Sequence, residues 1–435
     1  MKVKQFLAVF VFLIFWSCSM EDESLHDLII DNPMNHSVSI EEAQTELESL
    51  LDFFYSYDSK SEFPERRIIS ERYTINEVPS SRSDSSSVSK VIHVFNFEKE
   101  KGFALMAGDD RMPSLLGYSN QGNLRLNVTL ENLGFISFLD NLDQLMDLPD
   151  NELIYHGTGP MTYYSDFLGK GEYTYSYGPW ENYLYNESGN CLTKWGQGPP
   201  YNNHCPLVSE GKHCLTGCVT TAVAQLMSIY KHPKTYKDLT LDWNSMININ
   251  LLGPIDNDAD TVISVLMREL GKKENLNVKY GENSSSAKDA NIPRTLSNFG
   301  YSNGGKNIYK VIPEVENGNG VLMGGYSREK KYKIFGWTIA SSYSGGHEWL
   351  VHGMLERRRY LYKYDRNGQL VSRAKCSTFY PQCNWGWSGH RDGYYFYGNF
   401  DTNSGPVYPE SRKVSRSDVD YNYRYELTMI TGIRK

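Results

Sequence analysis

A cysteine and a histidine stand in sequence contexts that suit nucleophilic catalysis. Cys218 follows Gly217 and opens a segment whose apolar residues recur at helical spacing until Pro233. This spacing predicts an amphipathic helix with Cys218 in its first turn. Unpaired backbone N–H groups and the positive end of the helix dipole favour a thiolate there. His347, far downstream, could pair with it as an imidazolium, which would lower the thiol pKa further and later protonate a leaving amine.

Each of these residues also has a purely structural explanation. A cysteine on a helix is usually a small buried hydrophobic residue, and a single histidine in a strand usually belongs to the packing. Local signatures of catalytic cysteines do not transfer between families. The case for catalysis therefore depends on several motifs that occur together in one order.

Several motifs resemble, in their order along the chain, the streptopain family of papain-like cysteine peptidases. They are Trp195-Gly196-Gln197-Gly198, Thr216-Gly217-Cys218-Val219, Val278-Lys279-Tyr280-Gly281 leading into Ser284-Ser285-Ser286-Ala287, Gly345-Gly346-His347, and Asn384-Trp385-Gly386-Trp387. Upstream, the segments 93–96, 102–111 and 116–119 resemble the inhibitory pro-region of that family. The resemblance covers most of residues 38–435.

The resemblance implies both a fold and a reaction. The fold class is α+β, with a papain-like two-lobe peptidase domain preceded by a small α+β pro-domain. Cys218 would come from the helical lobe and His347 from the sheet lobe. The reaction would be peptide-bond hydrolysis through a thioester, with Cys218 as nucleophile and His347 as the group that transfers the proton.

The resemblance also assigns roles to five further residues. The Gln197 side chain and the Cys218 backbone N–H would form the oxyanion hole, while Asn384 and Trp385 would orient and shield His347. Ser286 and Gly346 match positions that contact substrate in the family. From the sequence alone each could equally be a surface, packing or turn residue.

The N-terminus is predicted to be a processing signal and not part of the fold. Lys2 and Lys4 precede an apolar run from Phe6 to Trp16, which is too short to span a bilayer and is typical of a signal peptide. Ser17-Cys18 resembles a bacterial lipoprotein cleavage site, so Cys18 is the predicted lipidation site. The alternative is ordinary cleavage nearby and full secretion. The chain is thus expected to be an exported protein, either an outer-membrane or cell-surface lipoprotein or a secreted one.

Composition shifts and pattern breaks divide the remaining chain. Residues 1–17 are the signal peptide and 18–37 an N-terminal tether. Residues 38–165 are the inhibitory pro-domain, which begins with a capping-box helix at Ser39. Residues 166–190, rich in tyrosine and glycine without clear periodicity, are the activation linker, and 191–435 are the peptidase domain. Strands are expected near 91–97, 103–107, 320–326, 332–339 and 348–354, and helices near 130–148 and 259–270.

Charge and cysteine content limit the partners. A net charge of −8 and a pI near 5.8 give no basic footprint for nucleic acid. Cys205 with Cys214, and Cys376 with Cys383, could close short disulfide loops that leave Cys191 free, but sequence does not fix the connectivity. The spacing of these residues matches none of the common structural zinc patterns. No metal and no cofactor are predicted, and the membrane is reached only through the N-terminal lipid.

The sequence therefore predicts a secreted or surface-anchored cysteine endopeptidase made as a zymogen. Its partners are protein or peptide substrates and its own pro-domain as inhibitor. One alternative is a catalytically inactive surface lipoprotein that uses the peptidase fold as a binding module. Another is acyl transfer to amines instead of water, which would use the same residues.

Overall fold

The computed structural model describes residues 37–58, 66–76, 91–109, 112–125, 138, 173–185, 191, 193–247, 258–305, 310–334, 337–396 and 428–435. The predicted signal peptide with Cys18, nearly all of the tether and all but Phe138 of the expected helix at 130–148 lie outside these residues. The helices of eight or more residues are α1 (Ile40–Asp58), α5 (Cys218–Tyr230) and α7 (Asp258–Leu270). Shorter helices are α6 (Trp243–Ile247), α8 (Ile292–Asn298) and α9 (Val311–Glu316), with 3-10 turns at Glu98–Glu100 and Asp289–Asn291.

The strands fall into one large sheet and two small hairpins. The large sheet contains β1 (Ile69–Asn76), β2 (Val91–Phe97), β3 (Phe103–Ala107), β4 (Leu115–Ser119), β5 (Tyr173–Tyr177), β6 (Glu181–Tyr185), β11 (Val321–Ile334), β12 (Trp337–Asp365), β13 (Leu370–Asn384), β14 (Gly393–Tyr395) and β15 (Thr428–Ile430). The hairpins are β7 (Leu207–Ser209) with β8 (Lys212–His213), and β9 (Thr235–Tyr236) with β10 (Leu239–Thr240).

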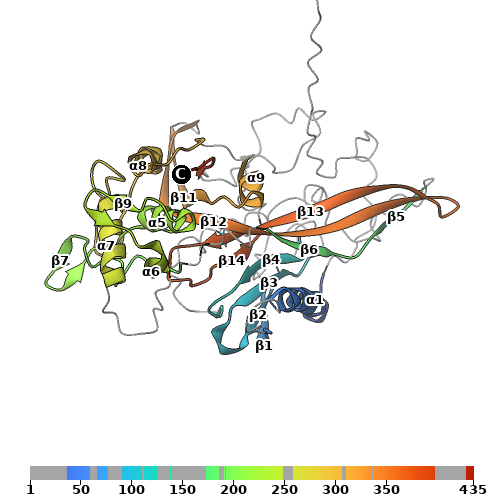
Figure 1. The fold of residues 1–435 in the computed structure, drawn as a ribbon. Coiled ribbons are helices and arrows are strands. Elements are labelled where there is room, and N and C mark those ends of the chain that lie inside the picture. Colours follow the sequence, from blue (N-terminus) through green and yellow to red (C-terminus); the bar gives the residue numbers. More distant parts are fainter. Residues whose placement is uncertain are drawn as a thin grey trace, which may run out of the picture.

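The N-terminal unit is one long helix against a four-stranded sheet (Figure 1). Ser39 and Glu42 form the predicted capping box, because the Ser39 N–H donates to Glu42 Oε2 (2.8 Å) and the Glu42 N–H donates to Ser39 Oγ (3.2 Å). The predicted strands at 91–97 and 103–107 are confirmed as β2 and β3. Five apolar side chains of α1 are buried against this sheet: Ala43, Leu47, Leu50, Leu51 and Phe54.

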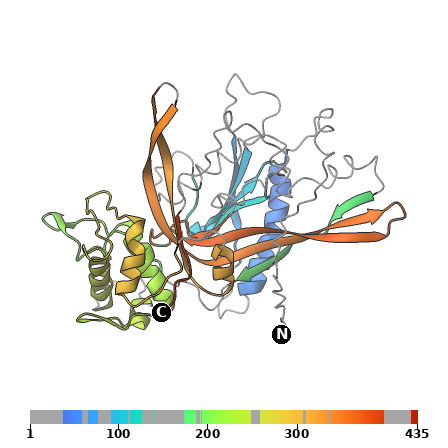
Figure 2. The ribbon, with the colours of Figure 1, turned by 90° about the horizontal axis from the view of Figure 1, so that it is seen from above.

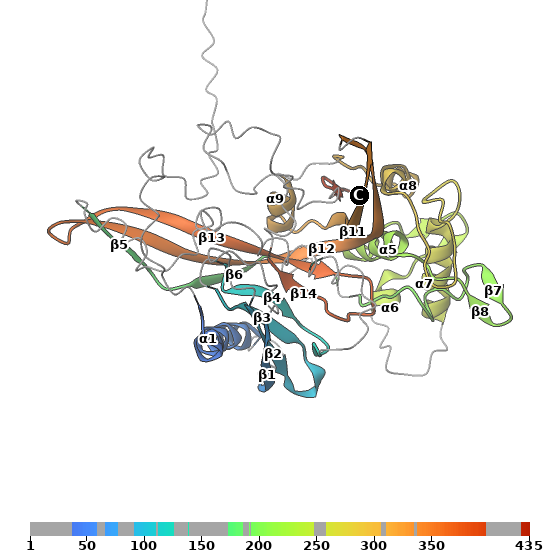
Figure 3. The same cartoon turned by 180° about the vertical axis from the view of Figure 1, so that it is seen from behind.

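This unit does not have a core of its own. Its sheet continues into the C-terminal sheet, in the order β1-β2-β3-β4-β14-β13-β12-β11-β15 (Figure 3). β4 pairs with β14 from Gly117 opposite Tyr395 to Ser119 opposite Gly393. On one face, the apolar residues of α1 pack with Leu355, Tyr380, Tyr394 and Phe396 of the C-terminal half. The two halves therefore share one sheet and one buried surface.

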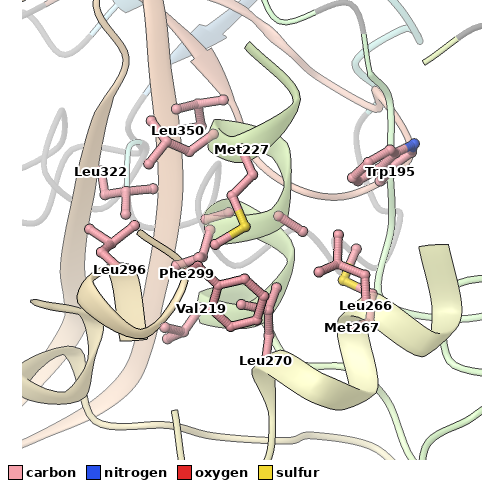
Figure 4. Close-up of a cluster of buried hydrophobic side chains, with 14 of the residues drawn as sticks. Trp195, Val219, Met227, Leu266, Met267, Leu270, Leu296, Phe299, Leu322 and Leu350 are labelled. Atoms are coloured by element: carbon pink, nitrogen blue, oxygen red, sulfur yellow. The ribbon is translucent and has the colours of Figure 1, made fainter. Parts of the chain in front are cut away.

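The C-terminal half has the predicted helical lobe and sheet lobe. α5 lies in the middle of the helical lobe, packed by α7, α8 and the β11–β12 strands (Figure 4). The predicted helix starting at Cys218 and the predicted helix at 259–270 are both confirmed. The expected amphipathic character of α5 is wrong, since every residue from Val219 to Ser228 is buried. Its polar positions, such as Thr221 and Gln225, hydrogen-bond inside the protein and do not face water.

The β12–β13 hairpin extends away from the rest of the sheet as a long arm (Figure 2). The turn of this hairpin follows Asp365, whose carboxylate accepts the N–H groups of Asn367 and Gln369. The linker predicted at 166–190 contributes β5 and β6, which pair with β12 along the arm. The separate strand expected at 332–339 is wrong. Residues up to Ile334 belong to β11 and those from Trp337 to β12, because the β11–β12 hairpin is longer than its apolar pattern indicates.

The described residues contain neither a membrane-spanning helix nor a cluster of metal ligands. None of the helices in this part of the chain is long and apolar enough to cross a membrane. Nor does any group of three or more His, Cys, Asp or Glu side chains, among the residues described, lie together as metal ligands would.

Gly393 offers a test of the junction between the two halves. A Cβ atom on Gly393 would lie 2.0 Å from the Tyr118 carbonyl oxygen, a backbone atom that cannot turn away. We expect Gly393→Ala to force β14 from β4 and to cost about 1–3 kcal/mol of unfolding free energy, as overpacking does. The measurement is the denaturant midpoint of the full-length chain made inactive by Cys218→Ala.

Gly198→Ala serves as the matched control, because nothing lies within 4 Å of a Cβ atom at that position. Equal midpoints for the two variants would contradict the tight β4–β14 junction.

Candidate active site

Cys218 is the first residue of α5 and lies beside the strand that carries His347. Gly217 precedes it with φ +88°, and a Cβ atom there would lie 2.9 Å from the Ser285 carbonyl oxygen, so the close approach requires glycine. The backbone N–H of Glu348, next to His347 on β12, reaches the Cys218 thiol, as do the N–H groups of Cys218 and Val219. The nucleophile candidate is therefore surrounded by N–H donors from both lobes.

His347 is buried on β12, with 3% of its surface exposed. Its Nε2 lies 2.8 Å from the Trp385 carbonyl oxygen, which can only accept, so Nε2 carries the proton in the neutral ring. Nδ1 is then the acceptor nitrogen, and it is buried without a hydrogen-bond partner. The ring of Trp349 lies nearly parallel to the His347 ring, at 13° and 6.4 Å between centroids. This arrangement fixes the tautomer that a general base at Nδ1 needs.

In the full-length chain His347 is buried and Cys218 is half-buried, and this loss of solvent shifts the pKa of both groups. It raises the pKa of the Cys218 thiol to about 11, even though the Glu348 N–H and the N–H groups at the start of α5 lower it; the Glu348 carboxylate adds to the rise. Burial also lowers the pKa of His347 to about 4, against a smaller opposite effect of its bond to Trp385. Both shifts favour the uncharged forms. The thiolate–imidazolium pair expected from the sequence is thus disfavoured in this state of the chain.

Gln197 is buried and tied to the start of α5. The Thr216 N–H donates to the Gln197 carbonyl oxygen (3.0 Å), two residues before Cys218. Ser286 lies on the loop beside Gly217 and is exposed, paired through its backbone with Lys279. Gly346 is exposed next to His347 and pairs with Tyr326 of β11. The structure thus brings the predicted oxyanion and substrate residues to the Cys218–His347 region.

Asn384 lies in a different network from the one expected. Its Oδ1 accepts from Gln225 Nε2 (2.8 Å), and its Nδ2 donates to Gln225 Oε1 and to the Thr193 carbonyl oxygen (both 2.9 Å). Gln225 is fully buried on α5 and also accepts from the Trp195 N–H (3.2 Å). Asn384 therefore joins the nucleophile helix to the segment that carries Gln197, while the Trp385 backbone holds His347.

The sequence reasoning missed Gln225 and Asp392. Gln225 lies two helical turns after Cys218, and a polar residue within the apolar run of α5 was the available signal. Asp392 Oδ1 accepts from the Trp385 N–H (2.9 Å), and the Asp392 carbonyl oxygen accepts from the Asn120 N–H (2.9 Å). Asp392 thus links the residue that holds His347 to the N-terminal half. No sequence pattern indicated this link.

The described cysteines other than Cys218 are separate thiols. Cys205 and Cys214 are both buried and unbonded, and Cys383 is buried in the sheet lobe. Burial raises the pKa of Cys205 to about 11. Cys191 contacts Thr193 Oγ1 at 3.0 Å. The side chain of Cys376 lies outside the described residues.

The raised pKa of Cys218 gives a kinetic prediction. Alkylation consumes the thiolate, and a thiol of pKa about 11 has at pH 7 roughly one hundredth or less of the thiolate of an ordinary cysteine, whose pKa is about 8.5. We expect Cys218 in the uncut chain to react with iodoacetamide that much more slowly, as measured by mass spectrometry of the peptide that contains it. Labelling of Cys218 at pH 6 faster than that of a free cysteine would contradict the uncharged pair.

Asp392 gives a prediction for pH dependence. Burial raises its pKa to about 7, against smaller lowering effects of the Trp385 N–H and Lys194. A carboxyl group whose pKa is raised on folding stabilises the fold fully below its unfolded pKa of about 4, and this stabilisation is lost as the pH rises through 7. We expect Asp392→Asn, which keeps an oxygen for the Trp385 N–H, to lose less thermal stability than the parent between pH 4 and pH 8. If the Tm of the variant and the Tm of the parent change with pH in parallel, Asp392 is not the group that causes the loss of stability.

Two family models match the chain. The Peptidase C10 family matches residues 195–395, and the Spi protease inhibitor family matches residues 37–146. Streptopain of Streptococcus pyogenes is 25% identical over 340 residues, which cover 70% of this chain and 73% of streptopain. The thiol protease/hemagglutinin PrtT of Porphyromonas gingivalis is 23% identical over 330 residues, or 70% of this chain and 33% of that protein.

Among solved structures, a fragment of Prevotella intermedia prointerpain A aligns with a TM-score of 0.47 and 19% identity, over 84% of this chain and 99% of that one. The family matches confirm the predicted papain-like α+β peptidase domain with a pro-domain ahead of it. The chain therefore contains a cysteine peptidase domain that matches the Peptidase C10 family at residues 195–395, preceded by an inhibitor-type pro-region at residues 37–146.

Proposed function

We propose that this chain is the zymogen of an exported cysteine endopeptidase that cleaves protein substrates. The observation that supports this best is the state of the His347 ring. Its Nε2 donates to the Trp385 carbonyl oxygen, which leaves Nδ1 as a buried acceptor, and the next backbone N–H on the same strand reaches the Cys218 thiol. A general base needs such an unprotonated nitrogen, here on the strand that contacts the helix of the proposed nucleophile.

In the proposed reaction, Cys218 Sγ attacks the carbonyl carbon of the scissile peptide while His347 Nδ1 takes the thiol proton. The carbonyl oxygen becomes negatively charged, and the Gln197 side chain and the Cys218 N–H donate to it. The C–N bond then breaks as His347 gives its proton to the amine, which leaves a thioester on Cys218. Water attacks the thioester with His347 again as base, and the acid and free thiol are released. One oxyanion donor is worth about 3 kcal/mol of barrier.

The exposed positions beside this pair are the proposed substrate contacts. Ser286 next to the start of α5 and Gly346 next to His347 lie on opposite lobes. An extended peptide between them would meet exposed backbone on both sides. Asn384 and Gln225 are proposed to keep the two lobes in register, and Trp385 to orient and shield His347.

The pro-domain, residues 38–165, is proposed to hold the enzyme inactive until the linker is cut. Its attachment to β14 and its shared core with the sheet lobe oppose dissociation. Because it is tethered, its effective concentration can reach about the millimolar range without tight intrinsic affinity. A cut in the linker removes this advantage and lets the pro-domain leave.

Export is proposed from the N-terminal sequence. Residues 1–17 would direct the chain out of the cytoplasm, and Cys18 would carry the lipid of a surface lipoprotein. Secretion without a lipid is the alternative, and the mass of the mature N-terminus separates the two.

The test is to mature the enzyme and assay it on an unstructured protein substrate under reducing conditions. We expect cleavage by the matured parent and none by Cys218→Ala. Gln197→Ala should lower kcat by about 10²–10³-fold, whereas Gln369→Ala, at the tip of the arm, should not change it. A trace of active enzyme should cut full-length Cys218→Ala between about Tyr155 and Asn190.

Four outcomes would count against the proposal. Full activity of an uncut chain would exclude the zymogen, and cleavage that persists in Cys218→Ala would exclude the nucleophile. A matured chain that neither cleaves nor reacts with a thiol-directed inhibitor would favour a binding module. Products that carry added amines in place of new carboxylates would indicate acyl transfer.

A further inference from the structure

The linker strand β6 occupies an edge of the catalytic strand. β11 pairs with β12 as far as Val321 opposite Val351, and β6 takes over with Tyr185 opposite Met354. β13 pairs along the other edge of β12 through this whole region. His347 is seven residues before Met354, about 23 Å along an extended strand. The edge that β6 covers is therefore a continuation of the edge beside the active site.

Two arginines of β12 contact one face of the β6 segment. The ring of Trp180, just before β6, lies 4.7 Å from the guanidinium of Arg357 and 4.3 Å from that of Arg359. The Asn182 side chain accepts from Arg357 Nε at 3.3 Å. These contacts hold an aromatic ring between two cations, an arrangement that binds most strongly when it is shielded from water.

The opposite face has its own pair of contacts. The Arg358 guanidinium lies 4.1 Å from the centre of the Tyr183 ring, and the Tyr185 hydroxyl donates to Glu356 Oε2 at 2.6 Å. Glu356 is 1% exposed and is also bound by Arg358, with Nη2 at 2.7 Å from Oε2. Hydrogen bonds and ion contacts hold the pKa of Glu356 near 2 despite its burial. Side chains of β12 thus contact β6 on both faces, in addition to the backbone pairing of the two strands.

The groups that cover this edge precede the peptidase domain. Trp180, Asn182, Tyr183 and Tyr185 belong to the linker. Arg357, with 3% of its side chain exposed, also donates to Glu46 Oε1 (2.8 Å) and Ser114 Oγ (3.1 Å) of the pro-domain. Removal of everything before Cys191 would therefore uncover an unpaired strand edge with three arginines.

We propose that this edge, Met354–Arg359 of β12, is an exosite of the mature enzyme that binds an extended segment of a protein substrate by strand addition, and that β6 blocks it in the precursor. The proposal rests on the proposed peptidase function and names a second substrate contact for it. The chemistry of β6 indicates the ligand: an extended segment with aromatic side chains on both faces and at least one carboxylate, as Glu46 supplies to Arg357. Main-chain hydrogen bonds to β12 would give the affinity, and the arginines would give the preference for aromatic and acidic side chains.

The charge of the arm supports an acidic and aromatic partner. Residues 356–376 contain seven arginines and lysines and two acidic residues, in a chain whose net charge is −8. The positive charge is therefore concentrated on this arm, which projects away from the helical lobe (Figure 2). Segments with carboxylates would be drawn to the arm before they reach the cleft.

The experiment compares a long and a short substrate of the mature enzyme. An unstructured acidic protein can reach both the active site and the exosite, whereas a fluorogenic tetrapeptide can reach only the active site. We expect Arg358→Ala and Arg357→Ala each to lower the ratio of kcat/KM for the long over the short substrate about fivefold, mainly through KM. Gln369→Ala is the control, because Gln369 is an uncharged, exposed residue in the turn of the same arm, beyond the part of β12 that pairs with β6, and should leave the ratio unchanged.

A synthetic peptide of residues 179–186 is the direct probe. It should inhibit cleavage of the long substrate and leave tetrapeptide cleavage unaffected, and a version with alanine at the positions of Trp180 and Tyr183 should not inhibit. The N-terminus of the mature enzyme should lie after Tyr185.

Several results would overturn the exosite. They are an unchanged ratio in Arg357→Ala and Arg358→Ala, inhibition of both substrates alike by the peptide, or a mature chain that keeps residues 173–185. Failure of the peptidase proposal looks different, because the tetrapeptide would then not be cleaved at all.

Discussion

The pairing of β12 is the constraint on which the rest of this structure depends. This strand carries His347, brings the Glu348 N–H to Cys218, and pairs in turn with β11, β13, β6 and β5. Because side chains alternate along a strand, a shift of its register by one residue would move His347 to the other face. The partners on both edges fix that register. Two of them, β5 and β6, come from a segment that the proposed activation would remove.

The pro-domain is connected to the His347 ring by a series of hydrogen bonds through Asp392 and the Trp385 backbone. The Asn120 N–H donates to the Asp392 carbonyl, the Asp392 carboxylate accepts from the Trp385 N–H, and the Trp385 carbonyl accepts from His347. Each bond contributes only about 1 kcal/mol net. Their effect is mainly positional, since they fix where the His347 ring points and which nitrogen carries its proton. The loop that supports His347 is therefore held from the pro-domain side in this state of the chain.

Much of the architecture could be predicted because local signals agree with the final packing. The capping box of Ser39 and Glu42 predicts the start of α1, and the apolar run after Cys218 predicts α5. β5 and β6 were not predicted, although the alternation of tyrosine with threonine and serine in β5 was an available strand signal. Their pairing partner, β12, lies far away in the sequence, so their place in the sheet could not be predicted. The hydrogen-bond partners of Asn384 could not be predicted from the sequence either. The Asn384 side chain bonds to Gln225 and not to His347 because Gln225 is the nearer partner in the folded chain. The order of motifs along the sequence does not show such distances.

The charge states of Cys218 and His347 follow from a competition that the position of Cys218 alone does not decide. N–H groups at the start of α5 and from Glu348 favour the thiolate, as the helix position suggests, yet burial outweighs them and raises the pKa to about 11. Burial also favours the uncharged form of His347, and it lowers the pKa of the imidazole to about 4. A thiolate and an imidazolium formed together would attract each other and carry no net charge, so the pair costs less to form than either ion alone. Any step that lets water reach Cys218 and His347 lowers the cost of both charges at once. Greater solvation alone would thus raise the reactivity of the thiol, without a change in the residues that surround it.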